Sequence, residues 1–183
     1  PLRKGRGRSL GSFGCSVWVD TAAIFNFGHR GDLAFLLEKL SKAHTLLTTP
    51  AVVAEITDPG RAAYYKKLLA DWFEVKSASA IPFDTNSLAA LSSILDPGEI
   101  SVLMLAKELQ ATAVLDEKAA RREADGLAVR FMGTLGLLQL ALQRKWIKDP
   151  ECLARVRQLC DRGFRIPRPA PHHTFAEYIL TVQ

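Results

Sequence analysis

Residues 112–122 read TAVLDEKAARR, a short apolar run that ends on two acidic residues and continues into an alanine- and arginine-rich stretch. The run is predicted to be a buried strand at 112–116, followed by a helix at 117–125. Asp116 then has two interpretations, because it either caps this helix or is carried by the strand to an active site. Glu117 is either an alternative ligand or a charge that favours the helix dipole.

The same alternation of short apolar strands and helices runs along the chain. Strands are predicted at 16–20, 44–49, 73–75, 112–116 and 127–132. Helices are predicted at 22–27, 31–40, 61–72, 85–95, 97–109, 117–125, 134–145 and 149–163, with one more that begins at Pro50 and is ended by Asp58-Pro59-Gly60. Near-continuous apolar strands between helices are typical of an α/β fold whose parallel sheet is covered on both faces.

Length and composition predict one soluble domain. With 183 residues, 48% hydrophobic and 23% charged, the chain has an ordinary globular balance and no apolar run long enough to span a membrane. We predict a basic flexible arm at 1–15, an α/β domain at 16–148 and a helical extension at 149–183 packed on that domain. The three cysteines form no CxxC pair, which favours a reducing compartment and hence a cytoplasmic location.

The net charge of +5 comes almost entirely from the first residues of the chain. Without Arg3, Lys4, Arg6 and Arg8, 20 basic residues face 19 acidic ones, so that the remainder is nearly neutral. The basic arm either contacts phosphates through counterion release or is a solvated tail.

Two acidic residues follow the first two strands. Asp20 ends the strand at 16–20 and is an N-cap, or else a ligand-binding group at the carboxyl edge of the sheet, where such folds bind ligands. With Pro50 at the first helical position, Glu55 is placed in the second helical turn, beyond any capping role. Glu55 is either a solvated helix glutamate or a functional residue, and its apolar neighbours favour the functional role.

Glu99 is expected both to cap a helix and to present its carboxylate at the sheet edge. Asp96 as N-cap and Glu99 at N3 make a capping box. Glu99 also heads a helical stripe of apolar residues and is expected to point toward the core side of the sheet edge. That stripe consists of Val102, Leu103, Ala106 and Leu109.

Carboxylates that share one crevice repel one another unless a cation lies among them. Mg²⁺ and Mn²⁺ take octahedral oxygen ligands, so either ion is the predicted cofactor. Motifs of other chemistries are missing, since the sequence contains neither GxxxxGK[ST] nor GxSxG. The four histidines, at 29, 44, 172 and 173, show no metal-ligand spacing.

Six segments in order carry a resemblance to a known family. They read VWVDTAAI, TPAVVAEI, LDPGEISVLMLAKEL, AVLDEKAARREA, VRFMGTLGLLQLA and LARVRQLCDRGFRI. This arrangement resembles the PIN-domain family of metal-dependent ribonucleases, and more narrowly the prokaryotic uncharacterised PIN subgroup related to VapC-type toxins. The resemblance covers about residues 16–180. It implies a three-layer α/β/α sandwich with a central parallel sheet.

The resemblance also implies the site. It carries the family's acidic positions onto Asp20, Glu55, Glu99 and Asp116. Asp20 and Asp116 are then the primary metal ligands with Glu99 beside them, whereas Glu55 orients a water or holds a second ion. One departure concerns the residues after the first acid, where Ala22 and Ala23 replace the usual Ser-Pro, so that a hydroxyl that could support Asp20 is missing.

Weaker substrate contacts are expected around these acids. Thr21 and Thr134 match polar positions of the family, although Thr134 is also a candidate N-cap. Arg121 and Arg122, one turn from Asp116, either meet the RNA backbone or are solvated.

The implied activity is Mg²⁺- or Mn²⁺-dependent hydrolysis of RNA phosphodiester bonds by the toxin of a toxin–antitoxin pair. The implied partners are an RNA substrate, a small antitoxin protein and a second copy of the chain in a homodimer, with no membrane. The alternative is a non-catalytic PIN scaffold that binds RNA or a protein partner.

Overall fold

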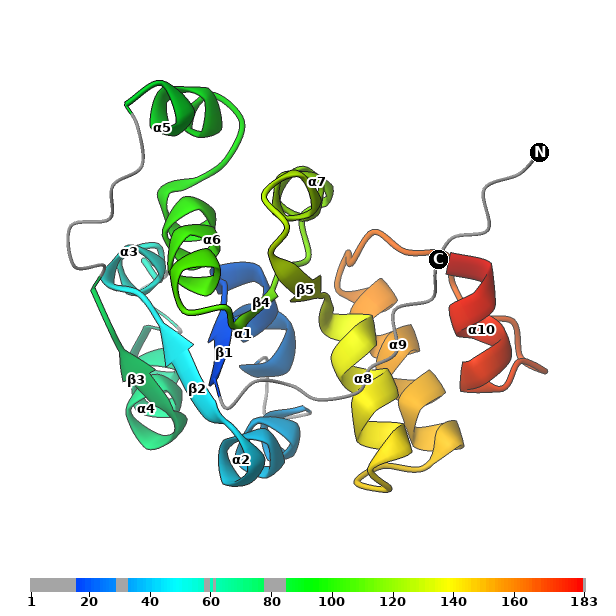
Figure 1. Cartoon of the computed structure of the whole chain (residues 1–183). Coiled ribbons are helices and arrows are strands. Elements are labelled where there is room, and N and C mark those ends of the chain that lie inside the picture. The colour runs from blue at the N-terminus through cyan, green and yellow to red at the C-terminus, as the bar shows by residue number, and fades with distance from the viewer. Residues whose placement is uncertain (1–15, 29–32, 58–59, 61, 78–84, 183) are drawn as a thin grey trace, which may run out of the picture.

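Five short strands form one sheet in which every neighbouring pair is parallel (Figure 1). The computed structural model describes residues 16–28, 33–57, 60, 62–77 and 85–182, so the predicted arm at 1–15 lies outside the described residues. The strands are β1 (Ser16–Val19), β2 (Thr45–Thr48), β3 (Phe73–Val75), β4 (Thr112–Val114) and β5 (Arg130–Met132), in the order β3-β2-β1-β4-β5.

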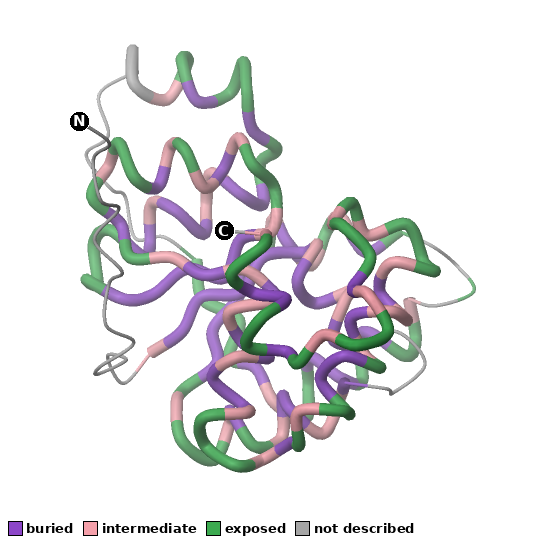
Figure 2. Tube along the Cα trace, turned by 90° about the vertical axis from the view of Figure 1, so that its right-hand side faces the viewer, coloured by how far each residue is buried: buried purple, intermediate pink, exposed green. Residues whose placement is uncertain are grey.

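The central strand β1 shows why these segments pair. Val17, Trp18 and Val19 are almost completely buried, and β-branched and aromatic side chains pack well on a pleated surface. Trp18 pairs in register with Leu47 of β2 on one side and Ala113 of β4 on the other. The three central strands β2, β1 and β4 are therefore mostly buried, whereas the edge strands β3 and β5 and the outer turns of the helices are partly exposed (Figure 2).

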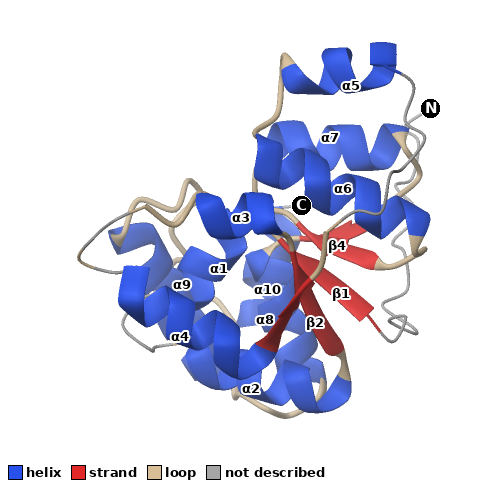
Figure 3. Ribbon diagram, turned by 90° about the vertical axis from the view of Figure 1, so that its left-hand side faces the viewer, coloured by secondary structure: helices blue, strands red, loops and turns tan. Residues whose placement is uncertain are grey.

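Helices cover both faces of the sheet. They are α1 (Thr21–Gly28), α2 (Ala34–Ala43), α3 (Pro50–Ala54), α4 (Ala62–Trp72), α5 (Thr85–Ser92), α6 (Pro97–Glu108), α7 (Lys118–Gly126), α8 (Thr134–Gln143), α9 (Asp149–Asp161) and α10 (Phe175–Val182). One face carries α1, α2, α4 and α8, and the other carries α6 and α7 with α5 outside them (Figure 3). The predicted three-layer α/β/α sandwich around a parallel sheet is confirmed.

Two details of the predicted helices are wrong. Helix α3 ends at Ala54 after five residues, and Glu55 is its C-cap and not a residue of a second turn. The chain leaves the helix through a tight turn in which the Ile56 N–H donates to the Val53 carbonyl at 3.2 Å. Leu109 does not extend the buried stripe of α6, because it is the C-cap of that helix and is 52% exposed.

The C-terminal helices pack outward from α8. Helix α9 contacts α8, and α10 contacts α9. Both Asp149 carboxylate oxygens accept the Phe175 N–H, at 2.9 and 3.0 Å, and the Tyr178 hydroxyl donates to the Pro167 carbonyl at 2.8 Å. In the part of the chain that the structure describes, no helix is long and apolar enough to cross a membrane.

Candidate metal centre

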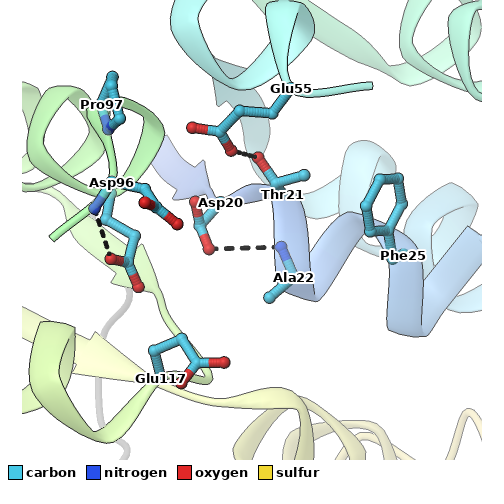
Figure 4. Close-up of a pocket in the computed structure, with 9 residues that line it drawn as sticks. Asp20, Thr21, Ala22, Phe25, Glu55, Asp96, Pro97 and Glu117 are labelled. Carbon is cyan, nitrogen blue, oxygen red and sulfur yellow. Dashed lines mark hydrogen bonds between the residues drawn. The ribbon is translucent and has the colours of Figure 1, made fainter. Parts of the chain in front are cut away.

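A cleft of about 430 Å³ opens at the carboxyl edge of the sheet (Figure 4). Asp20 directly follows β1, Glu55 ends the helix after β2, and Glu99 lies in the first turn of α6. Parallel strands direct their carboxyl ends to one edge, which is how these three acids meet although they are far apart in the sequence. The lining residues are Asp20, Thr21, Ala22, Phe25, Glu55, Asp96, Pro97, Glu99 and Glu117.

Asp20 is held at the floor of this cleft and is only 2% exposed. Its own N–H donates to the Val114 carbonyl at 3.2 Å, which fixes the backbone against β4. Its Oδ2 accepts the Ala22 N–H at 3.3 Å, so a backbone group supplies the support for which the sequence offers no hydroxyl. Its Oδ1 is buried and has no hydrogen-bond partner among the described residues.

Glu99 has both roles that its sequence position suggests. Its Oε2 accepts the Asp96 N–H at 3.1 Å, which completes the predicted capping box of α6. Its Oε1 is buried and has no hydrogen-bond partner in the described part of the chain. Oε2 therefore caps the helix, whereas Oε1 has a free acceptor position for an ion bound in the cleft that Glu99 lines.

The electrostatics of the cleft favour a proton or a cation. Burial raises the pKa of Asp20 to about 7, the nearby Glu99 and Glu55 carboxylates add to the rise, and backbone hydrogen bonds oppose it. Burial also raises the pKa of Glu99, and the charges of Asp96, Glu117 and Glu55 act in the same direction. These acids are therefore poorly stabilised as anions unless a positive charge joins them.

Glu55 differs from these two acids because both of its oxygens are hydrogen-bonded. Its Oε1 accepts the Gly98 N–H at 2.8 Å, and its Oε2 accepts a short hydrogen bond from the Thr21 hydroxyl. Thr21 is buried and lies beside Asp20 in the cleft wall. The hydroxyl predicted to contact substrate thus bonds to a carboxylate of the site.

Asp116 binds the start of α8. Its Oδ1 accepts the Thr134 N–H at 2.7 Å, and its Oδ2 accepts the Thr134 hydroxyl at 2.5 Å and the Asn26 amide at 2.8 Å. The prediction that Asp116 caps the helix at 117–125 is wrong, because Glu117 is the N-cap of α7. The interpretation of Thr134 as an N-cap is also wrong, since Gly133 has that position.

Of the adjacent acids at 116 and 117, only Glu117 is among the residues that line the cleft. Asp116 is not among these lining residues, and its role as a metal ligand stays a prediction. Its partner Asn26 is not among the residues that the sequence predicts for the site. A signal for Asn26 exists, since it is the one polar side chain among the apolar residues 22–27 and lies six residues, nearly two helical turns, after Asp20.

The two predicted arginines lie outside the lining of the cleft. Arg122 pairs with the adjacent Glu123 at 3.2 Å on the surface of α7. Arg121 is half-buried, and its Nη1 lies 3.8 Å from the place of a β-carbon on Gly133, close to the turn that leads into α8. Their contact with RNA stays a prediction.

The donor set fits a hard divalent cation that retains water ligands. No three His, Cys, Asp or Glu side chains among the described residues are grouped closely enough to enclose an ion by themselves. Asp20 Oδ1 and Glu99 Oε1 are nevertheless two buried, unpartnered oxygens in one acidic cleft. Mg²⁺ is commonly bound through one or two carboxylates and completes its octahedron with water.

Comparison with known proteins identifies the family. The family model described as DUF3368, a PIN domain, matches residues 16–175. A solved PilT N-terminus domain protein from the hyperthermophilic archaeon Sulfolobus solfataricus P2 is 19% identical, with a TM-score of 0.47 over 69% of this chain and 93% of that one. No curated protein matches the chain significantly. The chain belongs to the PIN-domain family, whose members are typically nucleases.

Proposed function

We propose that this protein is an endoribonuclease that hydrolyses RNA phosphodiester bonds with Mg²⁺ or Mn²⁺. The observation that carries the proposal is the pair of buried, unpartnered oxygens, Asp20 Oδ1 and Glu99 Oε1, in the cleft at the carboxyl edge of the sheet. Burying an ionised carboxylate without a partner is costly, so a cation is the natural occupant of this cleft.

The acidic residues at this edge of the sheet have different roles in the proposed reaction. Asp20 and Glu99 would hold the ion, and Glu55, fixed by Thr21 and Gly98, would supply a third negative charge at the wall of the cleft. When bound, such an ion would supply activation of a water at neutral pH and neutralisation of charge on the phosphate. Asp116 ties the end of β4 to helices α8 and α1 through its hydrogen bonds with Thr134 and Asn26.

The cation is needed for substrate binding as well as for chemistry. Five acidic side chains line the cleft, and without a positive charge they repel an RNA phosphate. RNA binding at this cleft is therefore expected to depend on the same ion as cleavage.

The narrower role, the toxin of a toxin–antitoxin pair, is proposed on the resemblance of the six sequence segments to VapC-type toxins. Growth arrest on expression of the protein, relieved by co-expression of the product of an adjacent gene, would support this role. Normal growth of cells that express active nuclease would contradict it.

The nuclease proposal is tested with the purified protein and a panel of single-stranded and structured RNAs in Mn²⁺, Mg²⁺ or EDTA. We expect cleavage with either metal, none in EDTA, and loss of cleavage in Asp20→Asn and Glu99→Gln. Glu108→Gln, at the exposed far end of α6, is the matched control and should keep full activity. Mn²⁺ binding without cleavage of any RNA would favour the non-catalytic scaffold instead.

A further inference from the structure

A glycine in the first turn of α6 lies directly against the Glu55 carboxylate. A β-carbon built on Gly98 would lie 2.5 Å from Glu55 Oε1, 2.7 Å from Oε2 and 2.8 Å from Cδ. Side-chain carbons do not approach other atoms this closely, so residue 98 can carry a side chain only if Glu55 moves. Gly98 is itself buried, and the three atoms belong to the far end of the flexible Glu55 side chain, so the carboxylate is the group expected to give way.

Glu55 comes this close because Gly98 binds it. The Gly98 N–H belongs to the first turn of α6, where backbone donors have no partner within the helix, and it donates to Glu55 Oε1 at 2.8 Å. The positive end of the helix dipole favours a carboxylate at this position. Absence of a side chain on residue 98 allows the contact.

Other contacts hold helix α3, whose C-cap is Glu55, against α6. At the opposite end of α3, the Thr49 and Ser101 hydroxyls are 2.7 Å apart, and Ser101 also donates to the Gly98 carbonyl at 2.7 Å. The Thr21 hydroxyl binds the second Glu55 oxygen from α1. Helices α1, α3 and α6 therefore converge on this one carboxylate.

We infer that Gly98 is a positioning residue that sets the place of the Glu55 carboxylate in the cleft, with Thr21 as its second support. The inference rests on the proposed nuclease function for its catalytic meaning. A carboxylate has about four acceptor positions. Gly98 and Thr21 use two of them, so the others stay available to a cation or a water in the cleft.

The test is a pair of glycine substitutions. Gly98→Ala forces Glu55 from its place, whereas Gly126→Ala, at the end of α7, adds a methyl group with no atom within 4 Å. We expect Gly98→Ala to weaken Mn²⁺ binding about tenfold and to lower RNA cleavage on the order of a hundredfold. Gly126→Ala should change neither, and equal effects of the two substitutions would overturn the inference.

A compensating substitution separates positioning from general damage to the fold. Glu55→Asp shortens the side chain by one methylene group and withdraws the carboxylate from residue 98. In the wild-type background this change should weaken Mn²⁺ binding, but in Gly98→Ala it should restore thermal stability and part of the Mn²⁺ affinity. If Gly98→Ala does not fold, Gly98→Ala/Glu55→Asp should fold. The inference would be overturned if the losses of Mn²⁺ affinity caused by the two single substitutions simply multiplied in the double variant. It would also be overturned if the double variant were no more stable and bound Mn²⁺ no more tightly than Gly98→Ala.

These readouts do not require the protein to cleave RNA. Mn²⁺ affinity is measured by electron paramagnetic resonance without RNA, and the melting temperature is measured in EDTA. A protein that cleaves no RNA but shows the coupling between residues 55 and 98 would refute the proposed function and keep the positioning role. A protein that cleaves RNA but shows no coupling between residues 55 and 98 would keep the proposed function and refute the positioning role.

Discussion

The carboxylate of Asp116 accepts the backbone N–H of Thr134 at 2.7 Å, although 18 residues separate the two in the sequence. The Thr134 hydroxyl donates to the same carboxylate at 2.5 Å. Asp116 follows β4 and Thr134 begins α8, so the contact ties the end of one strand to the helix that follows the next. The acid therefore has a structural role that is independent of any bound ion.

Removing this carboxylate should destabilise the metal-free protein. Asp116→Ala leaves the first turn of α8 without its acceptor, and we expect the free energy of unfolding to fall by about 1–3 kcal/mol in EDTA. Glu117→Ala is the control, because Glu117 is exposed and its side chain forms no cap on α7. Urea denaturation measures both. A loss for Glu117→Ala equal to that for Asp116→Ala would contradict the capping role.

Asn26 should act through Asp116. Its amide donates to Asp116 Oδ2 at 2.8 Å from α1, and the loss of a hydrogen bond to a charged group typically costs about 1.5–3 kcal/mol. Asn26→Ala should therefore destabilise the wild-type protein clearly and the Asp116→Ala protein much less. Urea denaturation of the four proteins gives the coupling free energy, and strict additivity would show that the two residues act separately.

Sequence periodicity was sufficient for the sheet and most helices, because buried parallel strands are short, apolar and bounded by turn residues. It placed Asp20 and Glu99 correctly for the same reason: one follows a strand and the other opens a capped helix. The prediction for helix α3 is too long because no glycine or proline marks its end at Ala54, and the partner of the C-cap residue Glu55 is Gly98, 43 positions away. Periodicity carries no information about such contacts.

The pair at 116–117 shows the same limit at the site. Both acids follow β4, and the sequence alone does not tell which one turns toward the cleft. The choice is made by Thr134 and Asn26, which bind Asp116 from two other elements and leave Glu117 to line the cleft. Long-range polar partners, unlike apolar stripes, leave no periodic pattern.

The raised pKa of Asp20 predicts how stability depends on pH. In EDTA the folded protein keeps the Asp20 proton up to about pH 7, whereas the unfolded chain loses it near the ordinary value of 3.8. Between pH 3.8 and about pH 7 the folded state thus binds more protons than the unfolded chain. The free energy of unfolding is therefore greatest near pH 4 and falls as the pH rises to about 7. Asp20→Asn cannot ionise and lacks this fall.

Urea denaturation of the wild type and of Asp20→Asn between pH 4 and pH 8 measures the difference in their free energies of unfolding. The advantage of Asp20→Asn over the wild type should grow by up to roughly 1.4 kcal/mol for each pH unit within the window. Glu108→Gln should follow the wild type, because Glu108 is exposed. A pH-independent difference between Asp20→Asn and the wild type would show that Asp20 ionises normally in the folded protein.

A divalent cation should stabilise the protein through the same oxygens. Asp20 Oδ1 and Glu99 Oε1 are buried without a hydrogen-bond partner in the described part of the chain, and a bound ion relieves this unpartnered burial. Adding Mg²⁺ or Mn²⁺ should raise the melting temperature of the wild type progressively with concentration, since ligand binding stabilises by RT ln(1 + [L]/Kd). Asp20→Asn and Glu99→Gln should lose the rise, and Glu108→Gln should keep it. A rise of equal size in all four proteins would place the ion elsewhere.

Thr21 offers the sharpest test between two roles, a support for Glu55 and a contact to substrate. Thr21→Val keeps the shape but removes the hydroxyl that donates to Glu55, whereas Thr21→Ser retains a hydroxyl. If Thr21 supports Glu55, then Thr21→Val weakens Mn²⁺ binding in the absence of RNA and lowers kcat, by about tenfold each, and Thr21→Ser restores both.

If Thr21 instead contacts the substrate, the same substitution leaves Mn²⁺ binding unchanged and raises KM, because only an interaction with RNA is lost. Mn²⁺ titration of the three proteins without RNA therefore decides between the roles before any cleavage is measured. The burial of Thr21 and its bond to Glu55 favour the first role, since a hydroxyl already donating to a carboxylate has no second proton to give to a phosphate.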